Sequence, residues 1–154
     1  MKTNTDDRPC LICSLEDAPE SARVFRDELW AAETVAGYDV PGWFFLRARR
    51  HAEQITALEP AELAAFGQRA RDLSAAMREA TGAPAVYLLH FGENYGHFHA
   101  VMAARGSDVP PQLRGGKLLQ LAPDALDTEA SLALVPVVRT AYEQLAAQPT
   151  GGAR

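Results

Sequence analysis

A long amphipathic helix between β-rich segments is the feature that most limits the folds open to this chain. Pro60 suits the first helical position, and Glu62 in the first turn favours the positive end of the helix dipole. Gly82 follows the last turn as a C-cap. The apolar residues between them recur at helical spacing, at Leu63, Phe66, Ala70, Leu73 and Met77. We predict roughly six turns of helix, at about 3.6 residues per turn, with this stripe in the core.

Before the helix, two segments are rich in β-forming residues. Residues 23–33 are predicted to form a hairpin, with Asp27 and Glu28 in its tight turn. Residues 43–49 follow a turn at Pro41 and Gly42 and are apolar enough to form a central strand. The first half of the chain therefore predicts three strands.

After the helix, the pattern returns to strands and then to a helix. Residues 85–91 and 97–103 are predicted strands, separated by a turn from Gly92 to Gly96. A helical stretch is predicted over 127–147, and Pro136 must kink it or begin a second helix. This order favours an α+β fold: an antiparallel sheet of about five strands, with the long helix packed on it and a C-terminal helical segment.

Length and composition are those of one globular domain. The chain has 154 residues, of which 47% are hydrophobic and 23% are charged. A chain of this size buries a core without help from disulfides. We expect a flexible N-terminus over residues 1–9, a single domain over 10–148 and a flexible tail over 149–154.

The charge pattern limits the partners. The formal net charge is −5, which disfavours nucleic acid as a partner. A small phosphorylated ligand stays possible, because a local cluster such as Arg47, Arg49 and Arg50 can hold phosphate oxygens. The N-terminus has early acids and no apolar run, and nowhere do eighteen apolar residues follow one another, so we expect no membrane partner and a cytoplasmic protein.

Two cysteines and two histidines stand out as metal ligands. In the cytosol, Cys10 and Cys13 at C-x-x-C spacing indicate a metal knuckle or a redox pair. Redox motifs of this kind open a helix after a strand, whereas these cysteines precede every predicted strand. With His51 and a second imidazole they complete the Cys2His2 set that tetrahedral Zn²⁺ prefers. The residues therefore favour metal over redox chemistry.

A histidine pair lies in the last predicted strand. On a strand, His97, His99 and Val101 share one face, so the two imidazoles are neighbours. From this segment alone, a structural polar pair and a functional pair are both open.

Three stretches together resemble a known family. "CLIC", "GWFFLRARRH" and "GENYGHFHAVMAAR" are similar to the CxxC-containing branch of the histidine triad proteins, whose signature is His-φ-His-φ-His-φ-φ. The resemblance covers most of residues 10–105 and is weaker in the C-terminal helical region. Starting the motif at His97 lets Gly92, Glu93 and Arg105 fall on the family's glycine, polar residue and closing arginine.

The resemblance implies separate roles for the two histidines. In the related galactose-1-phosphate uridylyltransferases, two cysteines, a histidine ahead of the first helix and the first motif histidine bind zinc. Carried over, a structural Zn²⁺ is held here by Cys10, Cys13, His51 and His97. The nucleophile is then His99.

The implied activity is that of a nucleotide hydrolase or nucleotidyltransferase. His99 would attack the α-phosphorus of a nucleoside phosphoramidate, a dinucleoside polyphosphate or a related nucleotide, forming a nucleotidyl-histidine intermediate. Asn94 would assist by donating to a phosphate or leaving group, and the substrate contacts would be Asn94, Glu93 and Arg105. The resemblance also implies a homodimer.

The sequence departs from the family pattern at two places. Val101 replaces the third motif histidine and can neither donate nor accept a hydrogen bond. Glu93 and Asn94 replace the usual phosphate-contacting pair, and an ionised Glu93 facing the phosphate would repel it. We favour an enzyme, with a catalytically weak or inactive, zinc-stabilised nucleotide-binding module as the alternative. A thiol redox protein using Cys10 and Cys13 is the third hypothesis.

Overall fold

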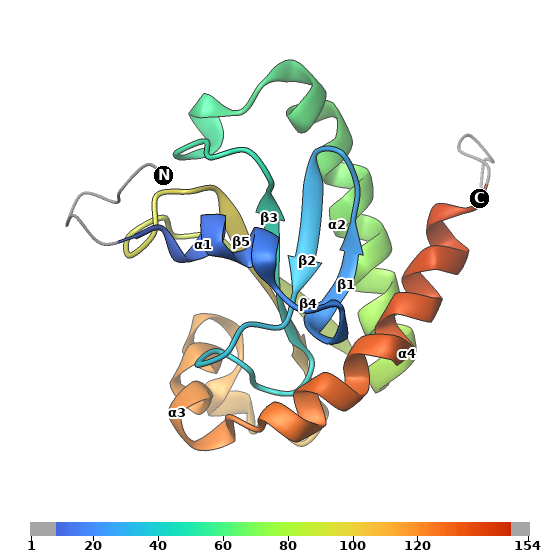
Figure 1. Ribbon diagram of the computed structural model, residues 1–154. Helices are drawn as coiled ribbons and strands as arrows, with labels where there is room; N and C mark the ends of the chain where they lie inside the picture. The colour runs from blue at the N-terminus through green and yellow to red at the C-terminus, as the bar shows by residue number, and fades with distance from the viewer. Residues whose placement is uncertain (1–8, 149–154) are drawn as a thin grey trace.

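One five-stranded antiparallel sheet organises the computed structural model, which describes residues 9–148 (Figure 1). The strand order is β1-β2-β3-β5-β4, and each neighbouring pair is antiparallel. The predicted α+β architecture is confirmed. The strands are β1 (Arg23–Arg26), β2 (Trp30–Glu33), β3 (Trp43–Ala48), β4 (Ala85–Leu89) and β5 (His99–Arg105). Of the expected flexible ends, residues 1–8 and 149–154 lie outside the described residues.

The predicted hairpin of β1 and β2 forms around an aspartate turn. The Asp27 carboxylate accepts hydrogen bonds from the backbone N–H groups of Leu29 and Trp30, each at 2.8 Å. An aspartate that bonds its own backbone a few residues on is a common way to stabilise a tight turn. The hairpin is therefore fixed locally.

The last strand begins two residues later than the sequence predicted. His97 and Phe98 pair with the segment after β3 instead of joining the regular ladder: Glu53 and His97 form an isolated bridge, and the Phe98 N–H donates to the Ala52 carbonyl at 2.8 Å. The chain therefore bends from one backbone partner to another at the two histidines.

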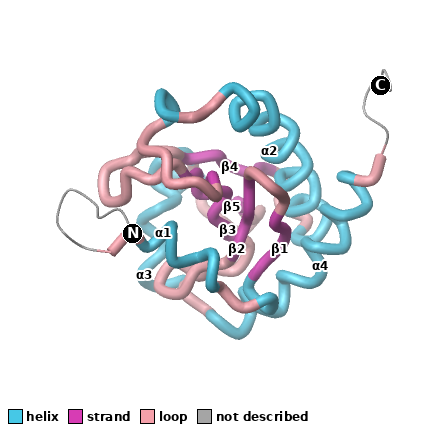
Figure 2. The backbone as a smooth tube through the Cα atoms, turned by 45° about the horizontal axis from the view of Figure 1, so that its top comes forward, coloured by secondary structure: helices cyan, strands magenta, loops and turns pink. Residues whose placement is uncertain are grey.

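Two long helices cover one face of the sheet. The helix α2 (Pro60–Thr81) ends at Gly82, whose φ of 71° is the left-handed conformation that glycine adopts freely. The helix α4 (Thr128–Ala146) begins where the Asp127 carboxylate accepts the N–H of Ala130. It continues through Pro136 as a single helix, so this proline does not begin a second one. Both helices lie on the same side in the two views (Figures 1 and 2).

The short elements lie mainly on the opposite face and in the connections. The helices α1 (Leu11–Ser14) and α3 (Ala122–Ala125) are on the side of the sheet away from α2 and α4 (Figure 1). The 3-10 turns are Leu15–Asp17, Glu20–Ala22, Ile55–Ala57, Pro111–Leu113 and Gly115–Leu121.

Alternation along the strands gives the two faces different jobs. Phe44, Leu46 and Met102 point to the helical face and are buried with Leu73 and Met77 of α2. On the other face, Phe45 packs with α1 residues and with Val101 in a second cluster. The central strands therefore build the main core on one face of the sheet. Their other face carries His97 and His99.

The apolar stripe predicted for α2 is wrong at its first member. Leu63 is 48% exposed, whereas Glu62 is buried. Glu62 faces inward because it closes a capping box with Glu59, and its side chain also accepts from Arg50 at 2.7 Å. Its carbonyl accepts the indole N–H of Trp30. No helix in the part of the chain described here is long and apolar enough to cross a membrane.

Two leucines of α2 provide a matched test of this packing. Leu73→Ala should lower the free energy of unfolding by about 2–5 kcal/mol, since Leu73 is fully buried and leaves a cavity. Leu63→Ala should change it by no more than about 0.5 kcal/mol. Urea denaturation measures both; similar losses in the two variants would contradict the packing described here.

Candidate metal centre and ligand pocket

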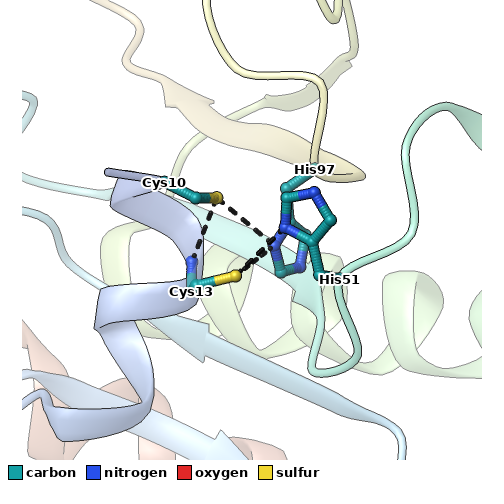
Figure 3. A group of neighbouring side chains, drawn as sticks. All are labelled: Cys10, Cys13, His51 and His97. Atoms are coloured by element: carbon teal, nitrogen blue, oxygen red, sulfur yellow. Dashed lines mark hydrogen bonds between the residues drawn. The ribbon is translucent and has the colours of Figure 1, made fainter. Parts of the chain in front are cut away.

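Four side chains from three separate segments meet beside α1. Cys10 and Cys13 come from the start of that helix, His51 from the segment after β3, and His97 from the residue pair before β5 (Figure 3). Their ligand atoms all lie within 4.8 Å of one another. The four residues expected to hold metal are thus brought together.

The distances suit a tetrahedral metal. Cys13 Sγ lies 3.1 Å from His51 Nδ1 and 3.4 Å from His97 Nδ1, and Cys10 Sγ lies 3.6 Å from His97 Nδ1. Zinc bonds of about 2.3 Å to sulfur and about 2.0–2.1 Å to nitrogen place such atoms about 3.5 Å apart in a tetrahedron. The set fits one metal ion with every position filled by protein, which leaves no open site for a substrate or a water.

Both imidazoles are oriented for binding by hydrogen bonds on their other nitrogen. His97 Nε2–H donates to the Ala48 carbonyl at 2.6 Å, and His51 Nε2 lies 3.3 Å from Glu53 Oε1. These partners leave the Nδ1 lone pairs directed at the thiols. Carbonyl and carboxylate partners of this kind are typical of histidines that bind metal.

Burial sets the protonation of the metal-free ligands. Burial lowers the pKa of His97 to about 4, so its imidazole is neutral at neutral pH, as a metal ligand must be. Burial, with a hydrogen bond to Cys10, raises the pKa of Cys13 to about 11. A metal entering this site must therefore displace a thiol proton.

The cysteine segment is attached to the sheet by ion pairs as well. The Arg47 guanidinium donates to both oxygens of Glu33, at 3.0 and 2.7 Å, and to Glu16 Oε2 at 2.7 Å. Arg49 Nη2 donates to Glu16 Oε1 at 2.8 Å. Arg47 and Glu33 are fully buried, and Glu16 lies three residues after Cys13. This Arg47 network therefore ties the segment that carries both thiols to strands β2 and β3.

The arginines considered as a phosphate-binding cluster all form internal ion pairs. Arg47 and Arg49 are held by Glu16, and Arg50 is held by Glu62 at 2.7 Å. The strand-end arginines thus serve internal ion pairs.

A pocket of about 400 Å³ opens at His99, two residues after the candidate metal ligand His97. Its wall is mostly aromatic and apolar, with few polar side chains, as in small-molecule sites. Its lining residues are Tyr38, Phe45, Leu89, Phe91, Gly92, Glu93, Asn94, Tyr95, His99, Val101 and Leu119.

His99 lies in this pocket with one ring nitrogen already engaged. Its ring stacks on Phe45, with centroids 5.3 Å apart and planes 21° apart. His99 Nδ1 lies 2.8 Å from the His97 carbonyl, and since a carbonyl only accepts, Nδ1 carries the hydrogen. Burial lowers the pKa of His99, which favours the neutral ring. Nε2 is then the unprotonated nitrogen available to a ligand.

The other expected site residues do not all reach the pocket. Glu93, Asn94 and Val101 line it. Arg105 does not: it pairs with Ala85 at the far end of β5, six residues from His99, or about 20 Å at strand spacing. A substrate contact by Arg105 remains a prediction.

Two tyrosines complete the pocket and were missed by the sequence reasoning. Tyr38, from the β2–β3 connection, forms a side-chain hydrogen bond with Tyr95, and burial raises the pKa of Tyr38. Tyr95 lies 6.5 Å from His99 between ring centroids. Its place two residues before the first motif histidine, His97, was a usable signal, whereas nothing in the sequence connects Tyr38 with that motif.

The loop between β4 and β5 is held at both ends by Gln54. The Gln54 N–H donates to the Gly96 carbonyl at 3.0 Å, and Gln54 Nε2 donates to the Gly92 carbonyl at 3.3 Å. Gly92 has a φ of 69°, and a Cβ there would come within 2.7 Å of the Gln54 side chain. Gln54 lies three residues after His51, so the segment that holds the pocket loop also carries one of the four candidate metal ligands.

His90 has a packing role near the pocket. Its Nδ1 lies 2.7 Å from the His99 carbonyl, and its ring lies 4.6 Å from that of Phe98. It is not among the pocket-lining residues.

Comparisons with known proteins identify the fold. No protein-family model matches the sequence, and no curated protein matches it. A hypothetical histidine triad nucleotide-binding protein from Sulfolobus tokodaii superposes with a TM-score of 0.69 at 22% identity, covering 88% of this chain and 93% of that one. A zinc-bound histidine triad family protein from Mycobacterium smegmatis gives 0.63 at 19% identity, covering 89% and 95%.

A uridylyltransferase is similar over part of its length. The TM-score is 0.65 at 21% identity, and the match covers 88% of this chain and 47% of that chain. The fold shared with these structures is the one that the histidine triad resemblance implied.

The Arg47 network can be tested through its most exposed acid. Although burial acts to raise the pKa of Glu16, hydrogen bonds from Arg49 and Arg47 outweigh it and lower the pKa from 4.5 to about 2. Stability from this carboxylate is therefore present above its unfolded pKa and is lost as the pH falls from about 5 to about 2. Glu16→Gln should cost about 1–3 kcal/mol at neutral pH, because it weakens the partner of a buried guanidinium.

The cost should shrink as the pH falls below about 5 and approach zero only near pH 2, where the folded carboxylate is itself protonated. Urea denaturation at several pH values, with chelator present so that metal release does not contribute, measures it. Asp17→Asn changes the same charge at the exposed neighbouring residue and should show little pH-dependent cost. A pH-independent effect of Glu16→Gln would refute the ion-pair explanation.

Proposed function

We propose that this chain, which has the fold of the histidine triad proteins, is a nucleotide hydrolase or nucleotidyltransferase that works through a covalent nucleotidyl-histidine intermediate on His99. One observation carries the proposal: His99 lies in an aromatic pocket with Nδ1–H donated to the His97 carbonyl, which leaves Nε2 as the nucleophile. The names of the similar structures, a histidine triad nucleotide-binding protein and a uridylyltransferase, support a nucleotide as the ligand.

The proposed reaction has two displacements at phosphorus. His99 Nε2 attacks the α-phosphorus of a nucleoside phosphoramidate, a dinucleoside polyphosphate or a related nucleotide. The Nε2–P bond forms, and the bond from phosphorus to the leaving group breaks with its electron pair. Water or another acceptor then attacks phosphorus, the Nε2–P bond breaks, and His99 is restored. The lowered pKa of His99 keeps Nε2 unprotonated for the first step.

The remaining site residues would position the substrate. Asn94 lines the pocket and carries an amide that can donate to a phosphate or leaving-group oxygen. Glu93 lines it as well and would contact the substrate. A contact by Arg105 rests on the motif alone.

We further propose that Cys10, Cys13, His51 and His97 hold a structural Zn²⁺. The donor set and the spacing between donor atoms support this metal. When bound, it would act as a structural cross-link. All four ligands would come from protein, so they would hold the segment with both cysteines, His51 and the start of β5 together. His99 follows His97 by two residues, and this arrangement would also help to position it.

One observation favours the alternative of a catalytically weak nucleotide-binding module. Val101 lines the pocket beside His99 and is the residue that the motif register places at the third histidine. It offers no hydrogen bond to the leaving group or to the nucleophile.

The fold resemblance further suggests a homodimer. The two free cysteines at a spacing typical of metal sites suggest a cytoplasmic protein.

The metal proposal predicts a defined stoichiometry. The purified chain should contain about one zinc per molecule, and Cys13→Ser or His51→Ala should lower that content several-fold, because each removes one of four ligands. Elemental analysis measures it. His90→Ala removes a histidine outside the cluster and should keep the metal; an equal loss in that control would refute the assigned ligands.

The catalytic proposal predicts a mass adduct. A single turnover with a panel of nucleoside phosphoramidates and dinucleoside polyphosphates should add the mass of one nucleotide, and His99→Ala should abolish the adduct and lower kcat about a thousandfold or more. Intact-protein mass spectrometry at neutral pH detects it. His90→Ala should still form the adduct. A zinc-loaded protein that binds nucleotide yet gives no adduct and no product would establish the binding module instead.

A further inference from the structure

The pocket around His99 has an unusual charge for a site proposed to bind phosphate. Among its described lining residues there is no lysine or arginine, and Glu93 is the one carboxylate. Arg47 of β3 is paired with Glu33 and Glu16, and Arg49 and Arg50, which follow the strand, are paired with Glu16 and Glu62. A substrate must therefore enter this pocket past a negative charge, with no cationic side chain in the pocket wall to balance its phosphate.

Glu93 itself is available to a ligand. It is exposed at the pocket, and it forms no ion pair or hydrogen bond with any other residue between 9 and 148. An ionised carboxylate offers acceptors only, so it attracts ammonium or guanidinium groups and repels phosphate and carboxylate. The unpaired Glu93 carboxylate is therefore suited to a cationic group on the substrate.

The loop holds Glu93 at a defined place. Residues 92–96 are clamped by the two hydrogen bonds from Gln54, and Tyr95 in the same loop is bonded to Tyr38 across the pocket. Asn94 and Tyr95 follow Glu93 directly and also line the wall. The clamped backbone therefore keeps residue 93 at the pocket wall, with its carboxylate exposed there.

The nucleoside and the leaving group would meet different surfaces. Tyr38, Phe45, Phe91 and Leu119 provide apolar and aromatic contact area, which suits a nucleobase and sugar. The attacking Nε2 and the leaving group lie on opposite sides of phosphorus in an in-line displacement. The leaving group is the part of the substrate whose charge varies most between substrate classes.

From these observations we infer that Glu93 determines specificity and makes the pocket select nucleotide substrates whose leaving group carries a positive charge, such as an amine with a second ammonium, over those with anionic leaving groups such as further phosphates. This inference rests on the proposed function, since it assumes that the pocket around His99 takes a nucleotide with a leaving group. An exposed charge pair is worth up to about fivefold. Between a cationic and an anionic leaving group, the attraction and the repulsion together should give a preference of about twofold to twentyfold.

Three matched substrates test the inference. They are phosphoramidates of one nucleoside whose amines have the same three-carbon chain: diaminopropane with a cationic end, propylamine with a neutral end and β-alanine with an anionic end. In the wild type, kcat/KM should fall in that order. Glu93→Gln should flatten the order, and Glu93→Lys should reverse it. Higher ionic strength should weaken the wild-type preference, because screening acts on exposed charges.

A matched control uses another exposed acid. Glu28 lies in the turn between β1 and β2, outside the pocket, and Glu28→Gln makes the same change of charge. It should keep the wild-type order. A wild type without preference, or a Glu93→Gln variant that keeps the preference, would overturn the inference.

A binding measurement separates this inference from the proposed function. His99→Ala cannot form the adduct, so calorimetric Kd values for the same three compounds report selectivity without chemistry. If no compound turns over in the wild type but the Kd values follow the charge order and depend on Glu93, the proposed catalysis fails and the charge selection stands. If turnover occurs with no charge order in kcat/KM or Kd, the selection fails and the catalysis stands.

Discussion

The ion pairs of the buried Arg47 guanidinium are the interaction on which the rest of the structure depends. It lies on the central strand β3 with no exposed area, and its charge is balanced by Glu33 from β2 and Glu16 from the segment after α1. Removing one partner of a buried pair typically costs about 3–5 kcal/mol, because an uncompensated charge stays behind. The cysteine segment is thus attached to the sheet by charge before any metal joins it to His51 and His97.

Backbone geometry gives two similar histidines different roles. His97 is buried and directs Nδ1 at the thiols because its Nε2–H is taken by the Ala48 carbonyl. His99 lies two residues later, and its Nδ1–H is taken by the His97 carbonyl, so Nε2 faces the ligand pocket. His97, the proposed metal ligand, thereby orients His99 through its own carbonyl. A shift of Cys10 and Cys13 that moved His97 would therefore also move His99 in the pocket.

The internal ion pairs also shape the pocket. Arg47, Arg49 and Arg50 are paired with acids of the 3-10 turn after α1, of β2 and of α2. Among the described residues, the pocket wall contains Glu93 and no cationic side chain. The aromatic side chains of Tyr38, Phe45, Phe91 and Tyr95 line the same pocket. This division explains how a chain with many strand-end arginines presents an acidic pocket.

The sequence by itself determined the turns and helix ends, because these depend on residues close to one another in the chain. The Asp27 turn, the span of α2 up to Gly82 and the start of α4 at Asp127 follow from local hydrogen bonding and helical periodicity. The Cys2His2 set followed from spacing, scarcity of such residues and the motif register.

Tertiary structure alone decided the rest. It buried Glu62 beside Arg50 and Trp30 while Leu63 stayed exposed, paired Arg47 with Glu33, and brought Tyr38 to the pocket. Each of these outcomes depends on contacts between residues distant in sequence, where the cost of burying a charge or a ring is set by partners that no local pattern specifies.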